Sequence, residues 1–224
     1  PEHAQLVIQQ ITAVLGSNYQ SAQQSAALSL GVLGSPDAIP TLYELMIDSQ
    51  AGQQLVGKHE VAVLVRAFAA LSFGFINSPD TVDKLITIVK RSPDRDKDLK
   101  TCALTALGMM RDNERREEII NFLIQLMADE KLDPIIKATV PTSLGKLGDP
   151  VALSTIVKHF KKEKQDNYIL QSCAIAMGLL ANIEDKEVID LLMKYIKDGK
   201  NDQARHFSYI AIAQIGARDT EPEK

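Results

Sequence analysis

The stretch SAALSLGVLGSPDAIPTL, residues 25–42, joins a run of small and aliphatic residues to a Gly-Ser-Pro turn and a second apolar run. It returns with changes as FAALSFGFINSPDTVDKL at residues 68–85 and as VPTSLGKLGDPVALSTIV at residues 140–157. Weaker versions follow at residues 102–119, 173–190 and 209–219. The chain is therefore built from repeated copies of one unit.

The six copies share a small residue at one position, which we call the small-residue column. Its members are Gly31, Gly74, Gly108, Gly145, Gly178 and Ala213. They are separated by 43, 34, 37, 33 and 35 residues, a spacing that fits a helix-pair repeat better than a coiled-coil heptad or a propeller blade. We interpret SQAGQQLVGK, residues 49–58 in the longest interval, as an enlarged loop.

The composition also indicates a helical protein. Of the 224 residues, 45% are hydrophobic but only 5% are aromatic, which favours many small helix contacts over one aromatic core. The formal net charge of −4 argues against generic nucleic-acid binding. Cys102 and Cys173 are too few for a disulfide scaffold, and no apolar run reaches the roughly 18 residues that a membrane span needs.

The first copy resembles the HEAT repeat, in particular the short bacterial and archaeal type called PBS-lyase HEAT-like, with the pattern L-G-x-L-G-D-P-x-A-I-P-x-L. The matching residues are Leu30, Gly31, Leu33, Gly34, Pro36, Ala38, Ile39, Pro40 and Leu42. The copy at residues 140–157 matches again between Leu144 and Leu153. The repeats cover almost the whole chain. The resemblance implies a fold more than an activity, because HEAT repeats underlie many functions.

We therefore expect an all-α fold, a right-handed α-α superhelix (α-solenoid) of about six HEAT-like helix pairs in a single domain. The pairs are expected at about residues 2–33, 37–76, 80–111, 114–147, 150–181 and 185–216. Residues 217–224 are expected to form a flexible tail. A Ser or Asp directly before a proline marks helix starts at Ser35, Ser78, Asp133 and Asp149.

Eight residues before the column lies a second repeated position, which we call the ladder position. It holds Gln23, Arg66, Lys100, Lys137, Leu170 and Arg205. The resemblance to HEAT proteins implies that the basic members, Arg66, Lys100, Lys137 and Arg205, form a structural ladder with Asp residues of the same or the adjoining repeat. The candidate partners are Asp48, Asp96, Asp129 and Asp198. A cationic stripe for phosphate or an acidic peptide is the alternative.

The positions three before and one after the column are those that the HEAT pattern leaves free toward the concave face. The predicted partner-binding residues at these positions are Leu28, Val32, Leu71, Phe75, Met109, Ile175, Leu179 and Ile210. As a surface they form an apolar groove for an amphipathic helix or an extended peptide. As core residues they fill the space between repeats, and this alternative stays open. Phe75, Met109 and Leu179 are the members expected to be exposed.

Charge is distributed unevenly along the chain. Residues 1–57 hold no Lys or Arg but nine Gln, and all 25 basic residues follow from Lys58 onward. A low-charge N-terminal repeat suits stacking against another repeat or domain, and a solvated Gln-rich face is the alternative. The lysines at Lys158, Lys161, Lys162, Lys164, Lys194, Lys197 and Lys200 are expected to form a solvated face rather than an anion site.

The residues offer no catalytic, metal-binding or cofactor-binding constellation. His59-Glu60 is similar to the His-Glu pairs of deoxyhypusine hydroxylase, a HEAT-like di-iron enzyme, but that chemistry needs several facing pairs. The chain contains neither a GxxxxGK[ST] loop nor a GxSxG turn. Cys102 and Cys173 are interpreted as core thiols.

The sequence thus predicts a non-catalytic protein-protein interaction scaffold with a protein or peptide partner, no nucleic-acid partner and no cofactor. Two alternatives stay open. One is a lyase-type or chaperone-like accessory subunit that grips a small apolar ligand or prosthetic group. The other is a structural repeat segment of a larger protein, with which the start at Pro1 is compatible. The compartment is open, with the cytoplasm favoured.

Overall fold

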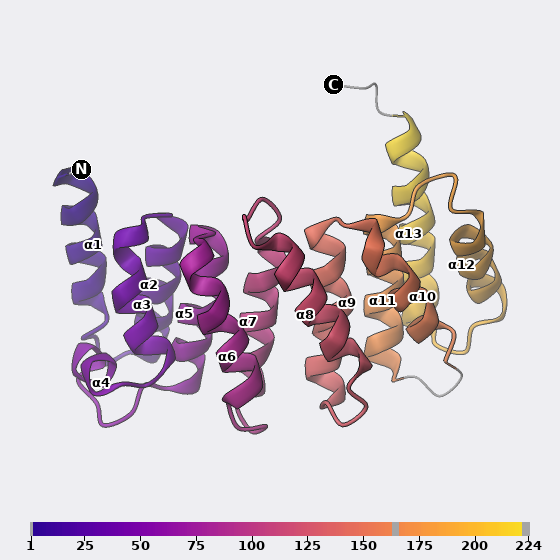
Figure 1. Cartoon of the computed structure of the whole chain (residues 1–224). Helices are drawn as coiled ribbons and strands as arrows, with labels where there is room; N and C mark the ends of the chain where they lie inside the picture. The colour runs from indigo at the N-terminus through magenta and orange to yellow at the C-terminus, as the bar shows by residue number, and fades with distance from the viewer. Residues whose placement is uncertain (1, 163–165, 221–224) are drawn as a thin grey trace. The chain divides into compact units, whose positions relative to one another are not determined.

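The computed structural model describes residues 2–162 and 166–220, and the regular structure in these ranges is helical throughout (Figure 1). Helix pairs follow one another along the chain, so the helical-repeat fold expected from the sequence is confirmed. Contacts between helices divide the chain into two compact units, Pro1–Arg116 and Glu117–Lys224. The single domain expected from the repeats stays a prediction.

Unit 1 contains three helix pairs, and in each pair we call the first helix A and the second helix B. The pairs are α1 (Glu2–Val14) with α2 (Gln20–Val32), α3 (Ile39–Met46) with α5 (Val63–Ile76), and α6 (Val82–Arg91) with α7 (Lys97–Met109). The B helices α2, α5 and α7 pack against one another in this order (Figure 1).

Unit 2 repeats this arrangement. Its helices are α8 (Arg116–Ala128), which begins at the boundary, α9 (Pro134–Leu147), α10 (Leu153–Phe160), α11 (Asn167–Leu180), α12 (Lys186–Asp198) and α13 (Asp202–Thr220). The A helices α10 and α12 pack on α11 and α13, and the B helices α9, α11 and α13 pack in series. Helix α13 reaches Thr220, although a tail was expected from residue 217, and residues 221–224 lie outside the described ranges.

Capping side chains start several of these helices. The Ser35 hydroxyl and the Asp133 and Asp149 carboxylates each accept a hydrogen bond from the backbone N–H two residues later, at 3.3, 2.9 and 3.0 Å. These three predicted caps are confirmed. Ser78 makes no side-chain cap bond, and its carbonyl instead accepts a hydrogen bond from the Thr81 hydroxyl at 2.7 Å. Short 3-10 turns precede three A helices, at Pro36–Ala38, Pro79–Thr81 and Pro150–Ala152.

The stretch that we interpreted as an enlarged loop contains a helix, α4 (Gln50–Val56). Its start is capped by the Ser49 hydroxyl, which accepts a hydrogen bond from the Gly52 N–H at 3.0 Å. Its end is set by Gly57, which has a φ of 63°, a left-handed conformation that glycine adopts without strain. The loop interpretation was wrong because polar residues such as Gln53 and Gln54 are good helix formers once both ends are capped.

The small-residue column lies where neighbouring B helices touch, within each unit. The contacting pairs are Gly31 with Ser72, Gly74 with Ala106, Gly145 with Ala176 and Gly178 with Ala211, and an added glycine Cβ would lie 3.0 Å or less from its partner. In every pair the partner stands two residues before the column in the next B helix. The column is therefore small because the helix backbones approach too closely for a side chain.

Candidate functional site

Arg66 shows what the ladder position does in unit 1. Its Nε donates a hydrogen bond to the carbonyl of Met46, the last residue of α3, at 3.0 Å, and its Nη1 forms an ion pair with Asp96 at 3.2 Å. The last carbonyls of a helix have no partner within the helix and form the negative end of its dipole. Arg66 therefore ties helix A to helix B of its own pair, and Asp96 extends this tie to the next pair.

The same tie recurs at most ladder positions. The further side-chain donors and their backbone carbonyl acceptors are Gln23 to Ser17 at 2.8 Å, Lys137 to Asp129 at 2.6 Å, and Arg205 to Ile196 at 3.0 Å. Each acceptor lies at or just beyond the last turn of the A helix of the same pair. The ladder is thus mainly a contact between a side chain and the backbone.

The carboxylate partners differ in part from the expected ones. Asp96 is used as expected, but Lys100 pairs with Asp94 at 2.8 Å. Arg205 pairs with Asp202 at 3.3 Å, three residues before it on α13. Since sequence spacing alone does not show which loop carboxylate reaches a lysine or arginine, these partners were missed. The role of the ladder in repeat geometry stays a prediction.

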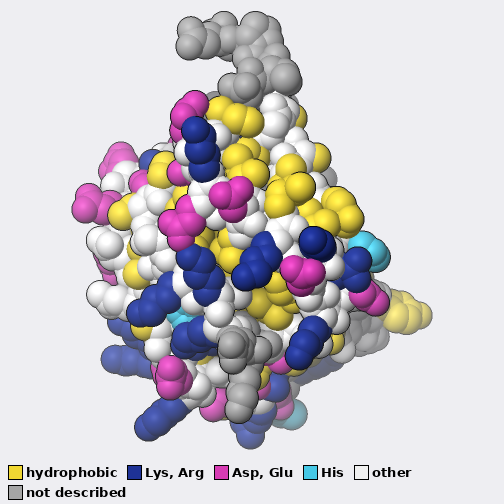
Figure 2. All heavy atoms as spheres, turned by 90° about the vertical axis from the view of Figure 1, so that its right-hand side faces the viewer, with side chains coloured by type: hydrophobic (Ala, Val, Ile, Leu, Met, Phe, Trp, Pro, Cys, Tyr) yellow, Lys and Arg dark blue, Asp and Glu magenta, His cyan; other side chains and the backbone are white. Residues whose placement is uncertain are grey.

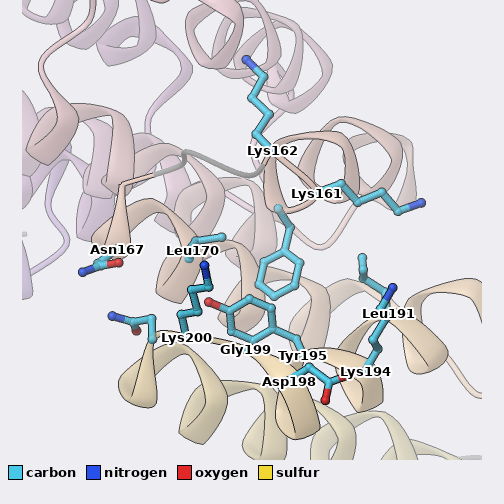
Figure 3. Close-up of a pocket in the computed structure, with 12 residues that line it drawn as sticks. Lys161, Lys162, Asn167, Leu170, Leu191, Lys194, Tyr195, Asp198, Gly199 and Lys200 are labelled. Carbon is cyan, nitrogen blue, oxygen red and sulfur yellow. The ribbon is translucent and has the colours of Figure 1, made fainter.

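Leu170 is the apolar exception at the ladder position, and beside it lies a cavity. Counted from Pro36 and Pro150, Phe160 of α10 corresponds to Met46 of α3. Leu170 has no polar group with which to reach the end of α10, and a space of about 790 Å³ remains there, lined also by α12 and the loop to α13 (Figure 3). We call it the A-end cavity. Its lining includes Phe160, Leu170, Leu191, Lys194, Tyr195 and Lys200.

The eight residues predicted to bind a partner are neither all core nor all surface. Val32, Phe75 and Ile210 are exposed, and Leu28, Leu71, Met109, Ile175 and Leu179 are half-buried. Met109 and Leu179 were expected to be exposed, but they reach back over the column: an added Cβ at Gly74 or Gly145 would lie 3.0 Å from the Met109 sulfur or the Leu179 Cδ1. The position after the column therefore also fills space between B helices. Partner binding at these residues stays a prediction.

In unit 2 the B helices α9, α11 and α13 form an open hollow of about 550 Å³, which we call the B-face hollow. Its lining includes Ile135, Thr139, Thr142, Tyr168, Ser172, Ile175 and Phe207. Ile175 belongs to the predicted set, whereas Ile135, Tyr168 and Phe207 were missed. Ile135 and Tyr168 lie seven residues before Thr142 and Ile175, so following the same helical stripe back by two turns would have found them. Ile135 is 50% exposed and Tyr168 is 60% exposed.

The titratable groups of unit 2 include one buried histidine, His159 on α10. Burial is the main reason that the pKa of His159 is lowered to about 4, and Lys162, Lys137 and Lys158 lower it further. Its Nδ1 has no hydrogen-bond partner among the described residues. Burial also lowers the pKa of Lys137, whose amine donates to the Asp129 carbonyl. These groups are held inside the repeat and do not line either hollow space.

The two cysteines are poor nucleophiles at neutral pH. Burial raises the pKa of Cys102 to about 11, with a smaller contribution from Asp98, and it also raises the pKa of the fully buried Cys173. A protonated thiol attacks slowly because the thiolate is the reactive form. Among the described residues, no three His, Cys, Asp or Glu side chains gather closely enough to hold a metal ion. The exposed His59 and Glu60 belong to the segment before α5.

None of the helices in the described ranges combines the length and the apolar composition required for crossing a bilayer. Of the lysine-rich region expected to be a solvated face, Lys158, Lys161, Lys162, Lys194, Lys197 and Lys200 are exposed. Lys164 lies outside the described residues. Figure 2 shows the end of unit 2 that carries α12, where Lys and Arg side chains border an area of hydrophobic side chains.

The fold of this chain is similar to that of a chain in a solved protein complex. A solved structure of the complex of CpcE and CpcF of phycocyanin lyase from Nostoc sp. PCC7120 contains a chain with a TM-score of 0.61 and 17% identity, over 97% of this chain and 90% of that chain. Human deoxyhypusine hydroxylase in complex with glycerol matches with a TM-score of 0.40 and 14% identity, over 94% of this chain and 84% of that chain.

Sequence comparison identifies the repeat itself. The family model of the PBS lyase HEAT-like repeat matches residues 22–48, which comprise most of α2, the turn at Pro36 and α3. No curated protein has a significant match to the sequence. The resemblance inferred from the first copy is thus confirmed: residues 22–48 match the PBS lyase HEAT-like repeat, and the chain has a helical-repeat fold.

Proposed function

We propose that this chain is a non-catalytic protein-protein interaction scaffold that binds an amphipathic helix or an extended peptide of a partner protein on its B helices. The observation that carries the proposal is the B-face hollow, in which side chains from α9, α11 and α13 surround about 550 Å³ of open space. The hollow is built on three stacked helices, so its shape is fixed before a partner binds. Such preorganisation reduces the entropic cost of association.

The chemistry of the hollow suits a protein partner. Ile135 and Tyr168 are half or more exposed, and Phe207 and Ile175 add apolar surface beside them. Tyr combines a large rigid apolar ring with a hydroxyl that tolerates water, which is why it is enriched among the residues that dominate binding energy. Thr139, Thr142 and Ser172 supply hydroxyl groups between the apolar residues. A partner helix with one apolar stripe and polar flanks would match this arrangement.

The B helices of unit 1 also expose apolar residues. Val32 at the end of α2 and Phe75 near the end of α5 are exposed, although both stand in helices that are otherwise rich in buried residues. Both occupy the position after the column. The structural relative from Nostoc is a chain of a two-protein complex, which adds support for a protein partner.

The test is a binding comparison between two double variants with purified protein. Ile135→Glu/Tyr168→Glu places two charges in the hollow, and Val151→Glu/Met193→Glu places them at residues with matching exposure, 60% and 54%, outside it. Circular dichroism checks that both variants keep their helices. We expect the hollow variant to lose at least tenfold in affinity for a partner captured by the wild type, and the control variant to retain it. Equal retention by both variants would remove the hollow from the binding surface.

A second candidate function is the lyase-type or chaperone-like accessory subunit that grips a small apolar ligand or prosthetic group. It is favoured by the size of the hollow, since clefts of about 300–1,000 Å³ are typical of small-molecule sites. The fold likeness to a chain of the phycocyanin lyase complex is compatible with it. Protein purified from its own source would then show absorbance above the aromatic band, lost in Ile135→Glu/Tyr168→Glu. Colourless wild-type protein that still captures a partner favours the scaffold.

A further inference from the structure

We propose that the A-end cavity of unit 2 is a binding site for a small amphipathic anion, a molecule with an apolar ring or chain and one carboxylate-like head group. The site shares no lining residue with the B-face hollow: the cavity is lined by the ends of A helices, the start of α11 and the α12–α13 loop, whereas the hollow is lined by other residues of the B helices. Its volume of about 790 Å³ is in the range of small-molecule sites.

The cavity lies at the repeat whose ladder residue is apolar. In α5 the Arg66 side chain crosses to the end of helix A and donates to the Met46 carbonyl at 3.0 Å. In α11 the equivalent side chain is Leu170, which is 8% exposed and ends in methyl groups. A leucine fills less length than an arginine and brings no positive charge. Leu170 therefore gives the cavity an apolar floor without a ladder cation.

The apolar part of the site is formed by two aromatic rings and two leucines. The rings of Phe160 and Tyr195 lie 4.8 Å apart with a tilt of 59° between their planes. Leu170 and Leu191 line the same space. An aromatic pair of this geometry is held rigidly and presents both a ring face and a ring edge to a ligand. Tyr195 also brings a hydroxyl group to the site.

The charged part of the site comes from Lys194 and Lys200. Neither forms an ion pair with a described residue, whereas Lys161 pairs with Glu187 and Lys162 with Glu130. Figure 3 shows the ends of Lys161 and Lys162 pointing away from Tyr195, so these two lysines are not part of the proposed head-group site.

The positions of the polar groups match an anion with an apolar body. In Figure 3 the Lys200 amine and the Tyr195 hydroxyl end on the side of the cavity where Leu170 and Asn167 lie. The Asp198 carboxylate lies on the other side of Tyr195 from the Lys200 amine. The Lys194 amine ends on the other side of Tyr195, beside Leu191, so Lys200 and the Tyr195 hydroxyl are the groups that would meet a head group on the Leu170 side. A hydrogen bond from a charged donor such as Lys200 is stronger than one between neutral groups. An apolar body resting on the rings would place its head group beside the Lys200 amine.

The experiment uses the full chain and a matched pair of probes, 1-naphthoate and 1-naphthalenemethanol, which share the ring system but differ in charge. Titrations followed by ¹H–¹⁵N NMR report both the affinity and the location. We expect naphthoate to shift the backbone amides of Leu170, Gly199 and Asn201 and to bind at least tenfold more tightly than the alcohol. Equal affinity of the two probes, or shifts confined to residues outside the cavity, would overturn the proposal.

Variants separate charge from shape. Lys194→Gln/Lys200→Gln removes the two unpaired charges, and Lys186→Gln/Lys197→Gln removes two exposed charges of α12 that do not line the cavity. The first is expected to weaken naphthoate binding at least tenfold, and the second less than twofold. Equal naphthoate binding by the two lysine variants would refute the site.

Discussion

Arg66 and Leu170 occupy the same position of the repeat in α5 and α11, yet the two regions differ in what lies between helix A and helix B. Around Arg66 the space is filled by a guanidinium group that contacts a backbone carbonyl and Asp96. Around Leu170 a cavity of about 790 Å³ remains. The packing of the B helices does not differ in this way, since Gly74 and Gly178 each lie against a small residue of the next helix. A helix-pair repeat can thus change one contact on the A-helix side and keep its stacking.

The largest loss of stability is expected from substitutions in the small-residue column, where the two regions are alike. Gly74→Val and Gly178→Val would each force a side chain against the next B helix, where an added Cβ lies 2.9 Å from Ala106 Cα or 2.7 Å from Ala211 Cα. Because these neighbours are backbone atoms that cannot rotate away, we expect each variant to lose about 3–4 kcal/mol of unfolding free energy, near the upper end for overpacking. Urea denaturation followed by circular dichroism measures the loss.

The control for the column is Gly216→Ala in α13, where an added Cβ meets no atom within 4 Å. This variant is expected to gain about 0.5–1 kcal/mol, because glycine is the more costly residue inside a helix. If Gly74→Val were as stable as Gly216→Ala, the close approach of the B helices could not be the reason for the column. A large loss in only one of the two regions would show that their stacking is not alike.

A smaller loss of stability is expected when Arg66 is replaced by leucine, the residue at the same position of α11. Arg66→Leu removes the hydrogen bond to the Met46 carbonyl and the ion pair with Asp96, and leaves a part-buried carbonyl without its donor. We expect a loss of about 2–3 kcal/mol, since bonds to charged groups contribute more than neutral ones. The exposed Arg91→Leu is the control and is expected to change stability by less than about 0.5 kcal/mol. A loss at Arg66 no larger than at Arg91 would contradict the structural role of the ladder.

The fold was predictable because the repeat is carried by local signals. The column of small residues, the proline turns and the spacing of the apolar residues all recur in the sequence, and each has a direct structural cause in helix packing or capping. The helix α4 was missed because its sequence, from Gln50 to Val56, has little apolar periodicity and depends on caps at Ser49 and Gly57.

The candidate sites were predictable only in part. The apolar stripe of the B helices could be followed from the column, but how far a side chain such as Leu179 bends over a neighbouring glycine depends on the distance between helices. The A-end cavity had a sequence signal in Leu170, the apolar exception among six ladder residues. Leu170 alone did not predict a cavity, because the rings of Phe160 and Tyr195 that line it come from two different A helices.

A smaller effect concerns His159, which takes the place of the buried Leu45 when α10 is aligned with α3 from Pro150 and Pro36. The pKa of His159 is about 4 in the folded chain, below the value of about 6.5 expected when unfolded. Below pH 6.5 the unfolded chain therefore binds a proton that the folded chain does not, and stability falls as the pH falls toward 4. We expect a loss of about 1–2 kcal/mol between pH 7 and pH 5.

The measurement is the urea midpoint of the wild type and of His159→Gln at both pH values. The variant has no imidazole to protonate, so its stability should depend less on pH over this interval. Desolvation is the main cause of the lowered pKa, with Lys162, Lys137 and Lys158 adding to it and Glu130 opposing it. If the wild type and the variant showed the same pH dependence, His159 would not be held neutral by its surroundings.

The smallest change in stability and in naphthoate binding is expected from substitution of Lys161. This variant tests which lysines contribute to the cavity. Lys161 is paired with Glu187 and holds the pKa of that exposed carboxyl below its ordinary value. Exposed pairs add little stability, because water and salt screen them. Lys161→Gln is therefore expected to leave both the urea midpoint and naphthoate binding unchanged, in contrast to Lys194→Gln/Lys200→Gln. If Lys161→Gln weakened naphthoate binding as much as the double variant does, the whole end of α10 would attract anions. The binding site would then be a diffuse basic surface rather than the A-end cavity beside Leu170.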